Sequence, residues 1–283
     1  MGKFRFLHFL REQWTELPIS TADVSDKSLV VVGANVGLGN EAAVHLAQLS
    51  PKSLLITSRD EAKCEGSKAD VETRSGMTDI ESWPLELCSF DSVRSFVNRF
   101  EAKGCTVDAL IANAGIVTIK YAKTPDGYET SLQVNYLSTA LLSTIDAAHL
   151  NKTGTPENPS RLVIVTSAVH YLANRLEGAD KWPSIIDKKR RGVLYLFAGS
   201  IYKGLMARTT DMGSRTLVHA AIEPVRGNGM VTTCRAVRLQ RSDYALSVEG
   251  REVSKRLWYE TIKILGDIDP RVRTIMSEYL IQD

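Results

Sequence analysis

Residues 29–47 read LVVVGANVGLGNEAAVHLA, and this stretch predicts the fold of the domain around it. The four apolar residues at 29–32 are typical of a buried strand, and the residues after position 39 have helical periodicity. Between them stand Gly33, Gly37 and Gly39 at a G-x3-G-x-G spacing. The stretch therefore predicts a strand, a tight turn and the start of a helix.

This turn suits the pyrophosphate of a dinucleotide. Gly33 lets the chain leave the strand at a φ that most residues avoid, and Gly37 leaves no Cβ between backbone and phosphate. Gly39 lets the helix and the strand pack closely, and the first amide groups of the helix then face the anion. The alternative is a glycine-rich turn of an α/β domain that binds no ligand.

The strand and helix pattern repeats along the chain. Strands are expected at 53–57, 83–87 and 107–111, with Asp91 capping a helix after the second of these three. This alternation predicts an α/β fold with a doubly wound parallel sheet, whose ligands bind beyond the carboxyl ends of the strands. Asn113 and Gly115 follow the strand at 107–111 and are expected at such an end.

The residues after the strand at 53–57 bear on the choice of cofactor. An acidic residue there would accept hydrogen bonds from the adenosine ribose, whereas an arginine can hold a 2′-phosphate. Arg59 follows Thr57 and Ser58, so the sequence favours NADP(H), and Lys63 adds a second positive charge. The alternative for both bases is a solvated loop side chain.

Composition narrows the class of partner. A chain of 283 residues is long enough for one large domain, and its net charge of +2 singles out neither nucleic acid nor a membrane. The four cysteines are far apart and the five histidines are scattered, so no metal site or disulfide framework is indicated. We expect a small-molecule partner and a reducing, cytoplasmic compartment.

Residues 1–24 are expected to form an N-terminal helical extension on the body of a domain that spans residues 25–283. Arg5, His8 and Arg11 interrupt the apolar residues before a secretory or membrane-spanning core is complete. The alternative is a weak contact with a membrane surface through the aromatic residues of this segment, Phe4, Phe6, Phe9 and Trp14.

Four spaced motifs carry a family resemblance. The glycine turn, Asn113-Ala114-Gly115, QVNYL at 133–137 and RLVIVTS at 161–167 together resemble the short-chain dehydrogenase/reductase superfamily. The sequence looks most similar to the retinol-dehydrogenase-like branch, which includes fungal reductases of secondary-metabolite pathways, and ARTTDMGSRTLVHAA at 207–221 resembles a late helix of that branch. The resemblance implies a Rossmann-type fold, an oxidoreductase that transfers hydride between NADP(H) and a ketone or alcohol of a small lipophilic substrate, and frequent homo-oligomers.

The resemblance also implies roles for single residues. It assigns a cofactor-binding role to five residues of the glycine turn, Gly33, Asn35, Gly37, Leu38 and Gly39. Glu86 stands where the family has an Asp that contacts the adenine ring.

Asn113 would line the nicotinamide ribose with Gly115 beside it, and Asn135 would support a proton-relay water. Ser167 would bind the oxygen of the substrate. The alternative for Ser167 is a hydroxyl that caps the turn after the strand.

The family's proton donor is a Tyr with a Lys four residues later, whose ammonium lowers the pKa of the phenol. We expect no such pair in this sequence. Tyr171 is followed at that position by Arg175 and lies closer to Ser167 than the family spacing, and Tyr202 is followed by Met206. Tyr171 and Tyr202 are therefore the candidates for a substitute donor.

The segment 168–206 is atypical throughout. KKRRG at 188–192 runs directly into VLYLF at 193–197, where the family has an active-site helix, a sixth strand and a Pro-Gly loop. Residues 193–197 either remain helical or replace the sixth strand. A genuine deletion, a splice variant and an error in the gene model would each produce this pattern.

Two functions of different class follow. The first is an oxidoreductase with weak activity, and the alternative is a nucleotide-binding remnant without catalysis. The tail is less informative: apolar residues between 253 and 265 predict a helix that ends at Gly266.

Overall fold

The computed structural model describes residues 15–118, 120–155, 158–166, 185–186, 209–223, 232–233, 236–237 and 243–280. In chain order the elements are β1 (Ser28–Val32), α2 (Leu38–Gln48), β2 (Ser53–Ser58), α3 (Glu61–Ser75), β3 (Ile80–Pro84), α4 (Phe90–Ala102), β4 (Ala109–Ala112), α5 (Thr130–Leu132), the π-helix η1 (Gln133–Ser138), α6 (Thr139–Thr153), β5 (Arg161–Ile164), α8 (Thr210–Ile222), β6 (Thr232–Thr233), β7 (Ala236–Val237), α9 (Asp243–Leu246), α10 (Val248–Ile268), α11 (Arg271–Ile275) and η3 (Met276–Leu280).

The five strands β1 to β5 form one parallel sheet in the order β3-β2-β1-β4-β5. After β3 the chain crosses to the other side of β1 to form β4, so the strand order reverses between β1 and β4. Ligands of doubly wound sheets bind beyond the carboxyl ends of the strands at such a switch point. The predicted α/β fold with a Rossmann-type sheet is confirmed.

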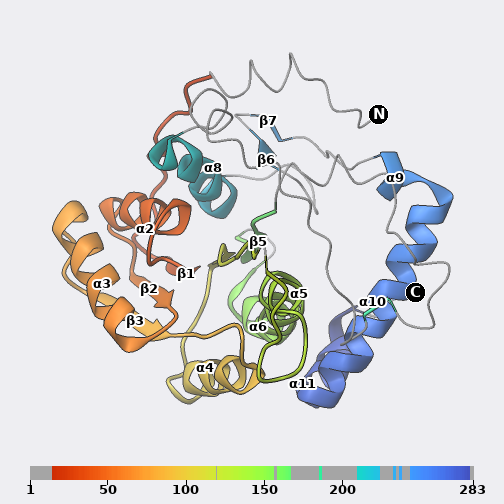
Figure 1. Ribbon diagram of the computed structural model, residues 1–283. Helices are drawn as coiled ribbons and strands as arrows, with labels where there is room; N and C mark the ends of the chain where they lie inside the picture. Colours follow the sequence, from red (N-terminus) through yellow and green to blue (C-terminus); the bar gives the residue numbers. More distant parts are fainter. Residues whose placement is uncertain are drawn as a thin grey trace.

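Helices cover both faces of this sheet (Figure 1). The alternation of side chains along β1 sends Leu29 and Val31 into the cluster with α2, α3 and α8. Val30 and Val32 enter the opposite cluster with α4 and α6. All five residues of β1 are buried, which explains why the sequence from Leu29 to Val32 is an unbroken apolar run.

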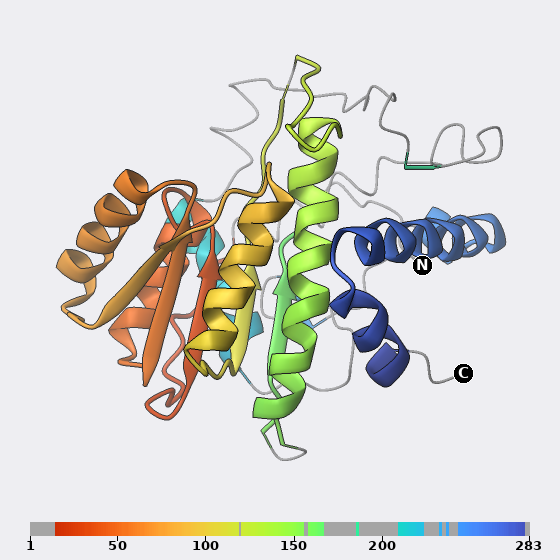
Figure 2. The ribbon, with the colours of Figure 1, turned by 90° about the horizontal axis from the view of Figure 1, so that it is seen from below.

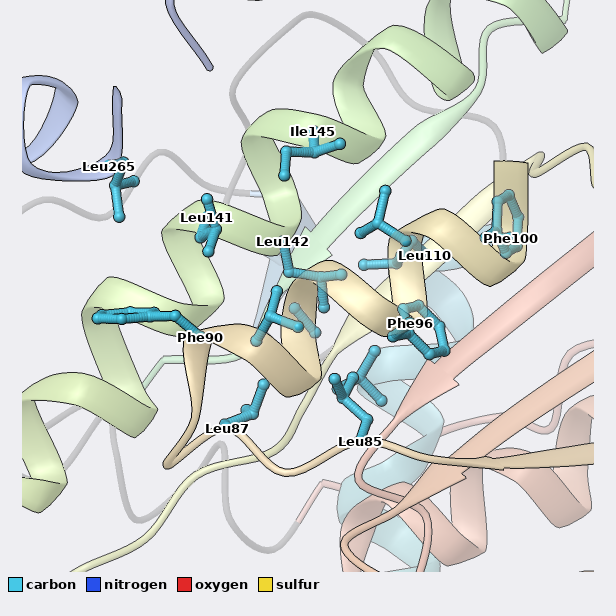
Figure 3. Packing of buried hydrophobic residues seen from close by; sticks show 14 of the residues in the cluster. Leu85, Leu87, Phe90, Phe96, Phe100, Leu110, Leu141, Leu142, Ile145 and Leu265 are labelled. Carbon is cyan, nitrogen blue, oxygen red and sulfur yellow. The ribbon is translucent and has the colours of Figure 1, made fainter. Parts of the chain in front are cut away.

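The larger cluster lies between the sheet, α4 and α6 (Figure 3). Phe96 and Phe100 of α4 pack near Leu110 of β4, and Leu142 of α6 lies close by. Leu265 of α10 has no exposed surface and belongs to the same cluster, so the C-terminal helices are joined to the core of the sheet domain.

The third strand and the helix after it begin earlier than expected. β3 is Ile80–Pro84 rather than 83–87, because it pairs in register with β2 from Leu54 opposite Ile80 to Ser58 opposite Pro84. Ser89, not Asp91, caps α4 by accepting a hydrogen bond from the amide of Ser92.

The prediction that Gly266 ends the C-terminal helix is wrong, since α10 continues to Ile268. A Cβ at position 266 would lie 2.8 Å from Cγ of Arg273. The glycine therefore allows the close approach of the segment that follows the helix.

The described part of the N-terminal extension, residues 15–24, is irregular rather than helical. Leu17 is buried there, its amide donates to Sδ of Met212 at 3.1 Å, and Arg215 donates to its carbonyl at 2.6 Å. Both partners belong to α8, and their contacts with the backbone replace the hydrogen bonds that a helix would make. Residues 1–14 lie outside the described part of the chain.

Strand β5 is an outer strand of the described sheet, where its pairing partner is β4. Leu162 and Ile164 point to the same side of β5 and are 37% and 49% exposed. Exposed aliphatic side chains at a sheet edge are a surface that proteins ordinarily cover. The replacement strand considered at 193–197 lies outside the described residues.

Candidate functional site

The glycine turn after β1 has the geometry that its sequence predicts. Gly33 and Gly37 have φ values of +82° and +71°. A Cβ at Gly39 would lie 2.2 Å from the carbonyl oxygen of Gly33 and 2.4 Å from Nδ2 of Asn113, so no side chain fits there. A Cβ at Gly37 would meet no atom within 4 Å, which leaves the backbone of this residue open to a ligand.

Three neighbouring elements hold this turn in place. The amide of Gly33 donates to Oγ1 of Thr57 at the end of β2 at 3.2 Å, and Nδ2 of Asn113 donates to the carbonyl of Gly33 at 3.0 Å. On the helix side, Nδ2 of Asn40 donates to the carbonyl of Ala34 at 3.2 Å. A turn fixed from three sides needs little rearrangement to bind an anion.

Helix α2 begins directly at the turn, and no side chain caps its N-terminus at Gly37. The amides of its first turn and the positive end of its dipole therefore suit a phosphate. Glu41 is the acidic residue in this first turn, and Nη2 of Arg74 lies 2.6 Å from Oε2 of Glu41. The arginine offsets the repulsion that this carboxylate would exert on a bound anion, so the turn fits a dinucleotide pyrophosphate.

The remaining two residues assigned to the turn lie at its surface. Leu38 is 36% exposed, and a Cβ at Gly213 of α8 would approach its Cδ2 to 2.8 Å. Asn35 is half-buried. Helix α8 therefore packs close to the start of α2.

The bases that favour NADP(H) differ in their surroundings. Arg59 has a side chain that is 62% exposed, with its Nε 3.8 Å from Oε2 of Glu86. Lys63 is already bound, because its Nζ lies 2.6 Å from Oδ2 of Asp60, and its hydrogen bond holds the pKa of Asp60 below its ordinary value. Of the two bases at this end of β2, Arg59 is thus the one with the weaker ion pair.

Glu86 lies beyond β3, close to the guanidinium of Arg59. Its Oε1 accepts a hydrogen bond from the amide of Cys88 at 2.8 Å, and its own amide donates to Oγ of Ser92 at 2.9 Å. These bonds fix the carboxylate beside Arg59, which is the neighbourhood that an adenine contact would require.

The loop after β4 is held by Asn135 of η1. Its Oδ1 accepts from the amide of Ile116 at 2.8 Å, and its Nδ2 donates to the carbonyl of Ile116 at 2.7 Å. A Cβ at Gly115 would lie 3.4 Å from this Oδ1, so the fit is close. Asn113, Gly115 and Asn135 thus meet at the carboxyl end of β4, next to the glycine turn.

The catalytic candidates Ser167, Tyr171 and Tyr202 lie outside the described residues. The expectation that no Tyr is followed by a Lys four residues later is wrong, because Tyr259 and Lys263 of α10 have this spacing. Tyr259 is 72% exposed, whereas Thr261 has no exposed surface. Side chains two residues apart on a helix point to nearly opposite sides.

Thr261 faces the body of the protein, because the hydroxyl of Tyr136 in η1 lies 2.7 Å from its Oγ1. Tyr259 therefore points away from the switch point of the sheet. A search for the spacing alone would have found this pair, and only its burial pattern separates it from a proton donor.

Within the described ranges, no cluster of three or more His, Cys, Asp or Glu side chains is arranged to hold a metal ion. The helices of the same ranges include none with the length and hydropathy needed to cross a bilayer.

The chain matches known proteins along most of its length. Residues 27–172 match the family model described as "short chain dehydrogenase". "Short chain dehydrogenase/reductase dmxR8" of Cryptosporiopsis sp. is 30% identical over 320 aligned positions, which cover 93% of this chain and 98% of that protein. Human "Polyprenol dehydrogenase" is 35% identical over 149 positions, covering 52% of this chain and 44% of that protein.

A solved structure also shares the fold. The crystal structure of an uncharacterized protein from Mycobacterium paratuberculosis has a TM-score of 0.63 and 23% identity, and it covers 89% of this chain and 98% of that one.

The long alignments contain positions that this chain lacks. Since 93% of 283 residues is about 263, about 57 of the 320 positions aligned with the Cryptosporiopsis protein stand opposite no residue here. The same holds for "Short chain dehydrogenase AOL_s00215g274" of Arthrobotrys oligospora, 28% identical: 89% of the chain is about 252 residues, which leaves about 59 of 311 positions.

Proposed function

Because this chain belongs to the short-chain dehydrogenase family, we propose that it is an NADP(H)-binding oxidoreductase that exchanges hydride with a ketone or alcohol of a small lipophilic substrate. The names of its fungal relatives do not state a substrate, and the assignment to secondary-metabolite biosynthesis is part of the proposal. The nicotinamide supplies the hydride chemistry when it is bound.

The observation that carries this proposal is the glycine turn. Its open backbone at Gly37, the α2 N-terminus without a side-chain cap, and the exclusion of any Cβ at Gly39 all fit a pyrophosphate. Asn113 and Asn135 lie at the carboxyl end of the neighbouring strand, where they hold the turn and the loop after β4. These residues bind and orient, and none of them is an acid suited to proton transfer.

In this proposal Ser167 binds the oxygen of the substrate and Tyr171 or Tyr202 donates the proton. Neither tyrosine has the lysine that lowers a phenol pKa in the family, so we expect slow turnover. General acid catalysis is typically worth about 10² to 10⁴ in rate, which is the deficit expected without a matched donor.

A second candidate function is a nucleotide-binding remnant without catalysis. It is favoured by the positions that long relatives have and this chain lacks, together with a family match that ends at residue 172. Both functions include cofactor binding and differ in turnover.

Arg59 is expected to distinguish the two nicotinamide cofactors. NADPH at 100 times its dissociation constant should stabilise the purified chain against thermal unfolding by about 2.7 kcal/mol relative to the chain without cofactor, and NADH at the same concentration should stabilise it less. Arg59→Ala should weaken NADPH binding by about 10-fold to 100-fold, since a hydrogen bond to a charged group is worth about 1.5 to 3 kcal/mol. NADH binding should stay unchanged. The measurement is a thermal-shift titration with both cofactors.

Lys63→Ala provides the control for this substitution, because Lys63 is already paired with Asp60. We expect it to change NADPH affinity far less than Arg59→Ala does. Equal stabilisation by NADPH and NADH in the unsubstituted chain would contradict the assignment of NADP(H), and no stabilisation by either would contradict cofactor binding as such.

A further inference from the structure

Helix α10 is attached to the protein by its C-terminal half. Thr261 and Leu265 have no exposed surface, and Tyr136 reaches Thr261 from η1. Figure 2 shows the helix extending sideways from the sheet domain. We call residues 248–259, its N-terminal part, the α10 arm.

One stripe of the α10 arm is exposed along its whole length. Val248, Glu252, Lys255 and Tyr259 follow a 4-3-4 spacing, which places them within about 60° of one another around the helix. Val248 and Tyr259 are both 72% exposed, and the side chains of Glu252 and Lys255 are 68% and 76% exposed. Large apolar side chains thus stand at both ends of the stripe, with charges of opposite sign between them.

This order makes the stripe complementary to itself. When two such helices pack antiparallel about a twofold axis, the first residue of one stripe faces the last residue of the other. Val248 then meets Tyr259 of the partner subunit, and Glu252 meets Lys255 of the partner subunit. Each contact occurs twice, so the pairing contains two apolar contacts and two ion pairs without a like-charge contact along the stripe.

We propose that the α10 arm is a self-association surface through which two copies of this chain form an antiparallel dimer. Within one chain, Nζ of Lys255 lies 3.2 Å from Oε1 of Glu252, but such an exposed pair contributes little to stability. Pairing across the axis adds a second carboxylate beside each ammonium. It also covers the two apolar ends, which a lone chain leaves in water.

The size of the stripe sets the strength of this dimer. The arm is twelve residues long, about 18 Å, and its contact area is well below the roughly 800 Å² per partner of a standard interface. We therefore expect a weak dimer that dissociates in the micromolar range. Sedimentation velocity of the full chain between about 1 and about 100 μM covers this range.

Charge exchange tests the pairing directly. Lys255→Glu places two carboxylates opposite each other at both contacts, and we expect the dissociation constant to rise by at least about tenfold. Adding Glu252→Lys to this variant restores opposite charges across the axis, so the double variant should dimerise as the unsubstituted chain does. Far-UV circular dichroism establishes that each variant keeps its helices.

The matched control is Lys68→Glu, which reverses a lysine of another surface pair, Lys68 with Glu72 on α3 at 3.7 Å. It should leave the dissociation constant unchanged. A monomeric unsubstituted chain at every concentration, a dimer that tolerates Lys255→Glu, or a double variant as weak as the single one would each overturn the proposal. None of these results depends on cofactor binding or turnover.

Discussion

Gly39→Ala is expected to abolish the stabilisation of this chain by NADPH. The new Cβ would lie 2.2 Å from the carbonyl oxygen of Gly33 and 2.4 Å from Nδ2 of Asn113, both of which belong to the fixed frame of the turn. Since backbone and Asn113 cannot both keep their places, α2 must move away from β1. The amides at its N-terminus then leave the position in which they face a pyrophosphate.

The expected magnitude is a loss of affinity of at least about 100-fold, together with a loss of folding stability of about 1 to 3 kcal/mol from overpacking. The measurements are a thermal-shift titration with NADPH and urea unfolding without cofactor.

Gly66→Ala is the matched control. Gly66 lies inside α3, where a Cβ would meet no atom within 4 Å, so alanine should stabilise the helix by about 0.5 to 1 kcal/mol and leave NADPH binding intact. Unchanged NADPH affinity in Gly39→Ala would show that the turn does not hold the pyrophosphate.

Asp146→Asn is expected to stabilise the protein above pH 7. Asp146 of α6 is 1% exposed, and burial, with a smaller contribution from Glu101, raises the pKa of its carboxyl to about 7. Its Oδ2 has no hydrogen-bond partner in the described part of the chain, and the nearest base, Nδ1 of His149, is 3.7 Å from Oδ1. The ionised form is therefore poorly compensated.

The direction in which the free energy of unfolding changes with pH follows from proton binding. Between about pH 4 and about pH 7 the folded chain keeps a proton on Asp146 that the unfolded chain has lost, so the free energy of unfolding falls as the pH rises. A pKa raised by about 3 units corresponds to a loss of about 4 kcal/mol, complete above pH 7. Asparagine cannot ionise, so the variant should lack this decline.

Urea unfolding between pH 4 and 8 measures the effect. Burial also lowers the pKa of His149, which makes the free energy of unfolding rise with pH. This contribution should be the same in both proteins. Asp70→Asn on exposed α3 should follow the unsubstituted chain. Parallel pH profiles for Asp146→Asn and the unsubstituted chain would contradict the expected pKa.

Local patterns allowed most of the described sheet domain to be predicted. The buried run before Gly33 and the glycine spacing indicated β1, the turn and α2, and the alternation after them indicated a parallel sheet. Boundaries were less accurate: the third strand was expected at 83–87 and is Ile80–Pro84, because pairing with β2 sets its limits. Hydrophobic pattern indicates that a strand exists, whereas its ends depend on the neighbour with which it pairs.

The sequence by itself determined the strand, turn and helix that suit a dinucleotide, since glycine spacing and side-chain periodicity are local properties of a chain. Only the tertiary structure decided which groups surround that turn. Asn113 reaches Gly33 across 80 residues of sequence, Arg59 lies beside Glu86, and the Tyr259 and Lys263 spacing lies on a helix whose buried side faces the other way. Such contacts arise from the packing of distant segments, which no local pattern encodes.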